Sequence, residues 1–87
     1  MHQIEEWVFP SKKTPKAIQK EVDKYCIEYG DYHQRCDPIR FSTEVLKSRL
    51  EAEEWIDRHD RGFYDCLAVK YKDGRRISWL VKFEFHV

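Results

Sequence analysis

The C-terminal part of the chain contains two runs rich in β-branched and aromatic residues, 63–71 and 75–87, on either side of residues 72–74. Such runs around a short loop with a glycine predict a β-hairpin. A two-residue Asp-Gly loop would put Leu67 and Val69 on the face opposite to the apolar side chains of the second run. A three-residue loop, with Gly74 left-handed, puts them on the same face. We expect the three-residue loop, because it gathers the apolar residues on one side: Leu67, Val69, Ile77, Trp79, Val81, Phe83 and Phe85.

A helix is predicted over residues 15–29. Thr14 can accept hydrogen bonds from the free N–H groups of a helix start, and Pro15 is tolerated at the first helical position. Apolar residues then recur at helical spacing, as on a helix that buries one side: Ile18, Val22, Tyr25, Cys26 and Tyr29. We expect Gly30 to end this helix in the left-handed conformation.

A second, shorter helix is predicted over residues 49–59. Ser48 and Glu51 have the spacing of a capping box, in which each side chain accepts a hydrogen bond from the other residue's backbone N–H. Gly62 lies beyond its end. The predicted buried side carries Ala52, Trp55, Ile56 and His59.

Two more strands complete the prediction. Residues 3–9 carry bulky apolar side chains and stop at Pro10, and apolar and polar residues alternate from Pro38 to Val45. The order is therefore β-α-β-α-β-β within a single domain, residues 1–87. We expect an α+β two-layer sandwich, a four-stranded mixed sheet with both helices on one face. The strand order does not follow from the sequence.

The composition excludes several classes of protein. Lys and Arg number 16 and Asp and Glu number 16, so the formal net charge is zero, which argues against a DNA-coating protein and against an acidic DNA mimic. Aromatic residues make up 15%, which argues against a disordered chain. The longest apolar run, residues 66–69, is far too short to cross a membrane.

The chain has three cysteines, and its first residues show no basic and apolar secretory signal. We therefore expect a cytoplasmic protein with reduced thiols. A bridge between Cys26 and Cys36 is within reach along the chain, but the expected compartment argues against it.

Metal binding and catalysis are not expected. The spacing of Cys26, His33 and Cys36 matches no common pair of close zinc ligands. A nucleophilic pair of Cys36 with His33 would lack a glycine-rich turn to form an oxyanion site. The single glycines also provide no phosphate-binding loop. We expect neither an enzyme nor a bound cofactor.

Charge layout suggests a binding surface. Lys16, Lys20 and Lys24 recur every four residues and stack on one side of the first helix, where like charges repel. A functional interpretation is contact with an anionic partner; the alternative is a solvated face offset by Glu21, Asp23 and Glu28. The remaining candidate contact residues are Lys12, Lys13, Lys70, Lys72, Arg75, Arg76, Glu53, Glu54 and Asp57.

These charges support two hypotheses. The first is a non-catalytic protein that docks on a protein partner, with the basic first helix and the acidic second helix as contacts. The second is a nucleic-acid or nucleotide-binding module that uses the lysines with the hairpin arginines. If the long strand at residues 78–87 is an edge, it could also pair with a second copy to give a homodimer.

Residues 64–71 and 79–87, together with 14–20 and 51–56, resemble small proteins of Firmicutes and their mobile elements. No established activity or catalytic residue comes with that resemblance. It implies a phage or mobile-element origin, and products of that size often inhibit host defence by stoichiometric binding, as anti-CRISPR proteins do.

Overall fold

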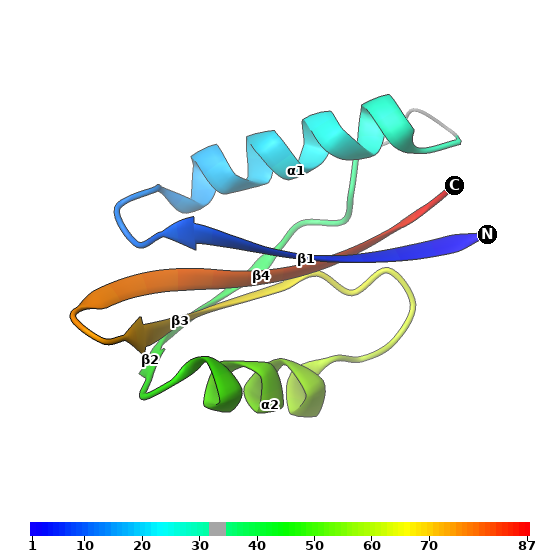
Figure 1. Ribbon diagram of the computed structural model, residues 1–87. Helices are drawn as coiled ribbons and strands as arrows, with labels where there is room; N and C mark the ends of the chain where they lie inside the picture. Colours follow the sequence, from blue (N-terminus) through cyan, green and yellow to red (C-terminus); the bar gives the residue numbers. More distant parts are fainter. Residues whose placement is uncertain (32–34) are drawn as a thin grey trace.

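The computed structural model describes residues 1–31 and 35–87 and shows a sheet between two helices (Figure 1). The predicted order of elements, β-α-β-α-β-β, is confirmed. Their bounds are β1 His2–Pro10, α1 Pro15–Tyr29, β2 Arg40–Leu46, α2 Arg49–His59, β3 Leu67–Asp73 and β4 Arg76–His86.

The mixed sheet has four strands in the order β1-β4-β3-β2. β4 pairs antiparallel with both β1 and β3, and β3 pairs parallel with β2. The last strand is thus central and both of its edges are used. A homodimer through that strand, which required it to lie at an edge, is excluded for this fold.

The two helices lie on opposite faces of the sheet, so the prediction of a two-layer sandwich with both helices on one face is wrong (Figure 1). Ile18 and Val22 of α1 pack with Val81 and Phe83, whereas α2 packs on the side of Leu80. The strand order explains the difference. The connection from β1 to β2 runs across the sheet in one direction and that from β2 to β3 runs back, and right-handed crossovers in opposite directions cover opposite faces.

The hairpin register also differs from the prediction. Asp73 pairs with Arg76, so the loop is the two residues Gly74 and Arg75. Gly74 has a φ of +63°, as the first position of a type II′ turn requires. Leu67 and Val69 therefore face α2, opposite to Val81 and Phe83. The prediction assumed one buried face, but this sheet is buried on both.

Both helix starts are as predicted. The Thr14 hydroxyl accepts from the backbone N–H of Ala17 at 3.2 Å, and that of Ser48 accepts from the N–H of Glu51 at 3.2 Å. The Glu51 carboxylate accepts from the N–H of Lys47, one residue earlier than the capping-box prediction.

Gly30 ends α1, but not in the left-handed conformation, since its φ is −83°. Glycine is required there for close approach. A Cβ would collide with the carbonyl oxygen of Cys26 and lie 3.2 Å from that of His86. The next residue, Asp31, donates its N–H to the same His86 carbonyl at 3.1 Å. The end of α1 is thereby fixed to the end of β4.

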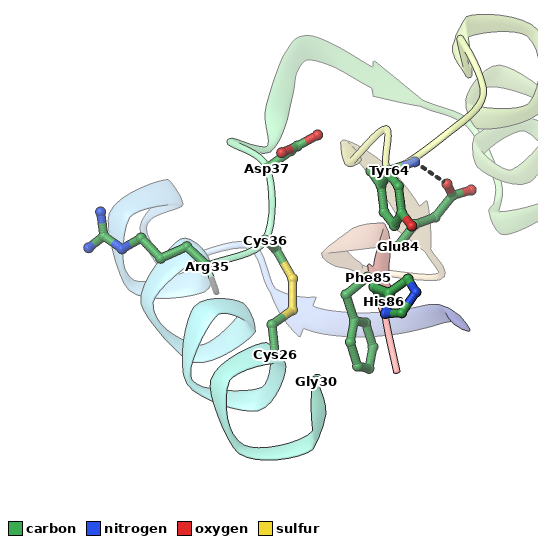
Figure 2. Close-up of a pocket in the computed structure, with 9 residues that line it drawn as sticks. All are labelled: Cys26, Gly30, Arg35, Cys36, Asp37, Tyr64, Glu84, Phe85 and His86. Carbon is green, nitrogen blue, oxygen red and sulfur yellow. Dashed lines mark hydrogen bonds between the residues drawn. A yellow bond between two sulfur atoms is a disulfide. The ribbon is translucent and has the colours of Figure 1, made fainter. Parts of the chain in front are cut away.

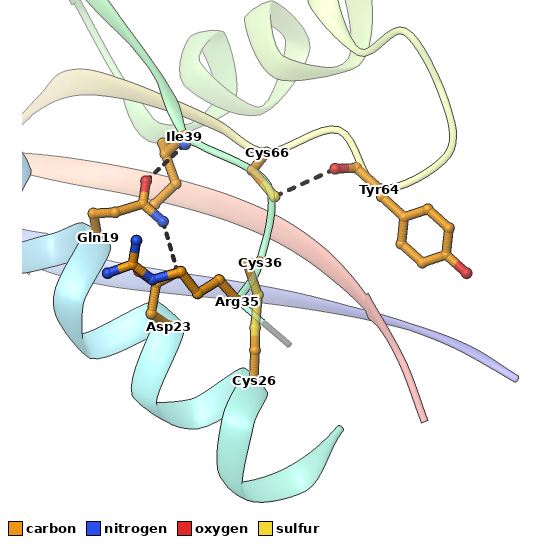
Figure 3. The surroundings of a disulfide bond; sticks show 8 residues. All are labelled: Gln19, Asp23, Cys26, Arg35, Cys36, Ile39, Tyr64 and Cys66. Carbon is orange, nitrogen blue, oxygen red and sulfur yellow. Dashed lines mark hydrogen bonds and ion pairs between the residues drawn. A yellow bond between two sulfur atoms is a disulfide. The ribbon is translucent and has the colours of Figure 1, made fainter. Parts of the chain in front are cut away.

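Cys26 and Cys36 form a disulfide, with Cα atoms 6.0 Å apart (Figure 3). The prediction that all three thiols are reduced is therefore wrong for this pair. Ile39 binds α1 through its N–H, which donates to the Gln19 side chain at 2.8 Å, and this contact brings the chain before β2 back along the helix. Cys66 is free and buried. The thiol argument for a cytoplasmic location no longer applies to Cys26 and Cys36.

Candidate functional site

The three lysines predicted to stack on α1 line one open groove on its outer side, with a volume of about 810 Å³. We call Lys16, Lys20 and Lys24 the lysine ridge; all are exposed. The other residues that line the groove are two acidic residues, one arginine, one amide and one exposed apolar residue: Asp23, Glu28, Arg35, Gln19 and Ile27.

No ion pair holds the lysine ridge among the residues that the structure describes. The acidic neighbours that could offset it are engaged elsewhere or stay solvated. Glu21 pairs with Lys13, and Asp23 accepts from Gln19 at 3.0 Å and lies 3.6 Å from Arg35. Figure 3 shows Arg35, in the segment after α1, beside Asp23 on the helix. The ridge therefore presents three cationic groups that the fold itself does not neutralise.

The hairpin tip forms a second basic area at the end of the sheet where α1 begins (Figure 1). Lys72, Arg75 and Arg76 are exposed there. Lys12 and Arg76 line a common open hollow of about 450 Å³. Two of its other lining residues are joined by a hydrogen bond of 3.0 Å from the N–H of Ser11 to the carbonyl of Ile77. The structure thus brings the tip together with Lys12.

Two further predicted lysines have aromatic contacts. The ammonium of Lys13 lies 5.3 Å from the ring centroid of Phe9, and that of Lys70 lies 4.9 Å from the ring centroid of Trp79. Each covers the sheet on the side of α1, so part of its role is packing.

The acidic residues predicted as contacts lie on α2, on the other side of the sheet. Glu53 accepts from Arg49 at 3.1 Å, and Arg49 also donates to Glu6 of β1 at 3.3 Å. Glu54 and Asp57 are exposed. These acidic residues and the lysine ridge thus lie on opposite faces of the sheet, although α1 as a whole carries three lysines and three acidic residues.

Sequence reasoning missed a buried group of charges behind the sheet. Lys82 and Glu84 of β4 are 6% and 4% exposed and pair with each other. Lys82 also donates to Asp60 at 2.6 Å and to the carbonyl of Asp65 at 3.2 Å. Glu84 accepts from the N–H of Tyr64 at 2.7 Å. The alternation of Lys82 and Glu84 within an otherwise apolar strand was the available signal, but it indicates burial only once both faces are known to be covered.

Hydrogen bonding keeps these groups charged. Burial alone would raise the pKa of Asp60, but hydrogen bonds from Lys82 and from the N–H of Gly62 outweigh it and lower that pKa. The pKa of Asp65 is likewise lowered by Arg40 and the N–H of Arg61 against the effect of burial. Burial would lower the pKa of Lys82, but its hydrogen bonds to Asp60 and Glu84 raise it.

A small cavity of about 250 Å³ lies beside the disulfide (Figure 2). Its walls include Cys26, Cys36, Phe85 and the buried carboxylate of Glu84, which Tyr64 and Lys82 already engage. The cavity is below the size usual for ligand pockets.

Cys36, which the sequence offered as a nucleophile, is bonded to Cys26 in the disulfide. Within residues 1–31 and 35–87 no cluster of three or more His, Cys, Asp or Glu residues is placed to hold a metal. His33 lies outside the described residues. Burial raises the pKa of the Cys66 thiol to about 11, so this thiol is protonated at neutral pH.

Comparisons with known proteins give no relative. No family model, curated protein or solved structure matches the chain. Neither described helix is both long and apolar enough to span a membrane.

Proposed function

We propose that this protein acts without catalysis, by binding an acidic surface of a protein partner through the lysine ridge. The observation that carries the proposal is the absence of ion pairs to Lys16, Lys20 and Lys24 in the described part of the chain, although acidic residues stand nearby. Stacked like charges disfavour the isolated helix, so an anionic partner would relieve a repulsion that the fold leaves in place.

The groove adds shape to this charge. The side chain of Ile27 is 42% exposed and lines the groove together with Lys24. A partner that pairs with the lysines can therefore also bury the apolar side chain of Ile27. The ridge lies on a capped helix of 15 residues that a disulfide fixes to the following segment. A rigid surface loses little conformational entropy on binding.

The test is a matched pair of charge reversals. The ridge variant is Lys16→Glu, Lys20→Glu and Lys24→Glu; the control reverses three exposed charges at the hairpin tip, Lys72→Glu, Arg75→Glu and Arg76→Glu. Each tagged protein captures partners from a lysate split into nuclease-treated and untreated halves. We expect a stoichiometric protein that survives nuclease treatment, is lost with the ridge variant and is retained by the control. Equal capture by the ridge variant would contradict the proposal.

The second candidate function is nucleic-acid or nucleotide binding at the hairpin tip. The hollow shared by Lys12 and Arg76, beside exposed Lys72 and Arg75, favours it, because phosphate groups bind where several cations converge. In that case the hairpin-tip variant loses binding, nuclease abolishes capture, and affinity falls steeply with salt concentration. A shallow salt dependence would exclude it.

The class of partner that the resemblance to mobile-element proteins implies is a host defence factor. The lysine ridge supports such a role, because charge complementary to an acidic target accelerates association. Inhibition of that partner's activity at a one-to-one ratio is the result we expect, and binding without inhibition would restrict the function to that of an adaptor.

A further inference from the structure

The groove along α1 includes a cation from outside the helix. Arg35 lies in the segment between α1 and β2, and its side chain lines the groove together with the lysine ridge. Figure 3 shows this side chain lying against the helix near Asp23. The spacing of the lysines does not predict this contribution, because Arg35 belongs to another segment of the chain.

Arg35 supplies a large share of the net charge of the groove. Four cationic and two acidic residues line it, which leaves an excess of two positive charges: Lys16, Lys20, Lys24 and Arg35 against Asp23 and Glu28. Without Arg35 the excess falls to one. The charge that would attract an acidic partner is thus not balanced within the groove, and one side chain provides half of it.

The guanidinium of Arg35 remains accessible to a partner. Its side chain is 82% exposed, and its Nε lies 3.6 Å from a carboxylate oxygen of Asp23. An ion pair this exposed contributes little to stability, because water and salt screen it. A guanidinium has several N–H donors in a planar fork, so Arg35 can stay near Asp23 and still bind a carboxylate of the partner in bidentate geometry.

The disulfide restricts the position of Arg35. The adjacent Cys36 is bonded to Cys26 of α1, and residue 35 lies outside the helices and strands. The hydrogen bond from the N–H of Ile39 to Gln19 holds the chain on α1 only further along the segment. With the bridge open, the polar contact that still holds Arg35 among the described residues is the exposed ion pair above. The side chain is then far less restricted.

We propose that Arg35 is the fourth cation of this binding surface and that the Cys26–Cys36 disulfide positions it, so that an acidic partner binds the oxidised chain more tightly than the reduced one. This role rests on the proposed function, because it adds a contact and a redox dependence to the same groove. Reduction acts in two ways. The groove loses one cation, and the carboxylate of Asp23 loses the cation that shields it from the partner.

The experiment titrates the isotope-labelled full chain with a peptide of ten glutamates at low salt and follows the backbone amide resonances of the groove. Wild type and Arg35→Gln are each compared oxidised and after reduction with dithiothreitol. The reagent passes two electrons and two protons to the bridge, which gives thiols at Cys26 and Cys36 and a cyclic disulfide of dithiothreitol. Arg58→Gln, at an exposed arginine of α2, is the matched control.

We expect reduction to weaken binding by the wild type about threefold or more, and Arg35→Gln to weaken binding by the oxidised chain by a similar factor. Reduction should have little further effect on Arg35→Gln, and Arg58→Gln should bind as the wild type does. Equal affinities of the oxidised and reduced wild type would overturn the proposal. The same loss on reduction with and without Arg35 would do so too.

Failure of the proposed function gives a different result. In that case the peptide leaves the groove resonances of the oxidised wild type unshifted, or shifts those of the ridge variant equally, and the redox dependence loses its basis as well. Loss of the dispersed amide spectrum on reduction alone would also contradict the proposal, because the bridge would then support the fold rather than the position of Arg35.

Discussion

The ammonium group of Lys82 on β4 donates to the carboxylate of Asp60, the residue that caps the end of α2, with 2.6 Å between Nζ and Oδ2. This contact fixes the α2–β3 loop to the centre of the sheet. It also makes a surface-like sequence feature, a Lys-x-Glu pair in the last strand, part of the interior.

We expect Lys82→Met to lower the free energy of unfolding by about 3–5 kcal/mol, because it removes the ammonium group that Glu84 and Asp60 share and leaves Glu84 buried with His2 as its remaining ion-pair partner. Urea unfolding followed by tryptophan fluorescence measures the change. Lys72→Met, at an exposed lysine of the hairpin, is the matched control and should change stability by less than about 0.5 kcal/mol. A similar small effect for Lys82→Met would show that the buried pair is not required.

Stability should decrease in acid through Asp60 and Asp65. Their pKa values are lowered by folding, so their contribution is complete above the unfolded value near 3.8 and is lost as pH falls through the lower folded values. We expect the free energy of unfolding to fall steeply below about pH 4. Asp65→Asn should make this dependence shallower. An unchanged slope in that variant would contradict the assignment.

Reduction of the disulfide should destabilise the protein. Cys26 and Cys36 are 10 residues apart, and closing a loop of this length stabilises a fold by about 2–3 kcal/mol in the chain-entropy view. We expect the Cys26→Ser, Cys36→Ser variant to unfold at lower urea concentration, and reductant to have the same effect on the wild type. Thiol titration of the unfolded, unreduced protein should find one thiol, that of Cys66; three thiols would contradict the bridge.

Stability and binding should respond in opposite directions to Lys20→Glu. The change converts two repulsive pairs, with Lys16 and Lys24, into attractive ones and one attractive pair, with Asp23, into a repulsive one, so it should stabilise the helix by about 0.5 kcal/mol. It also removes the central cation of the ridge, so partner binding should weaken. Thermal unfolding and titration of the captured partner measure the two effects. Stronger binding by this variant would argue against an acidic partner surface.

Gly30→Ala should be costly although Gly30 has an ordinary φ. The added Cβ collides with backbone at Cys26, which cannot rotate away, so we expect a loss of about 1–3 kcal/mol. Gly62→Ala is the informative comparison, because a Cβ there meets no atom within 4 Å and the strain is that of a positive φ alone. If both substitutions cost the same small amount, close approach is not what requires glycine at position 30.

Candidate contact residues could be predicted in part. The spacing of Lys16, Lys20 and Lys24 places them on one side of any helix, so their common face followed from the sequence. Whether they are neutralised did not, because Glu21 and Asp23 find partners outside the ridge. The buried role of Glu84 was hidden for the same reason, since it depends on contacts between distant segments.

The sequence by itself determined the order of the elements and the ends of both helices, but not the start of β3, which was predicted at residue 63 and lies at Leu67. Thr14, Ser48 and Pro15 act on N–H groups within one helical turn, and apolar periodicity is a property of a few successive residues, so α1 and α2 lie where predicted. Tertiary structure alone decided the layers, the hairpin register and the disulfide. Because β4 lies between β1 and β3, the two crossover connections run in opposite directions across the sheet. Each face of the sheet is therefore covered by one helix. That arrangement is set by the pairing of β1 with β4, whose strands come from opposite ends of the chain.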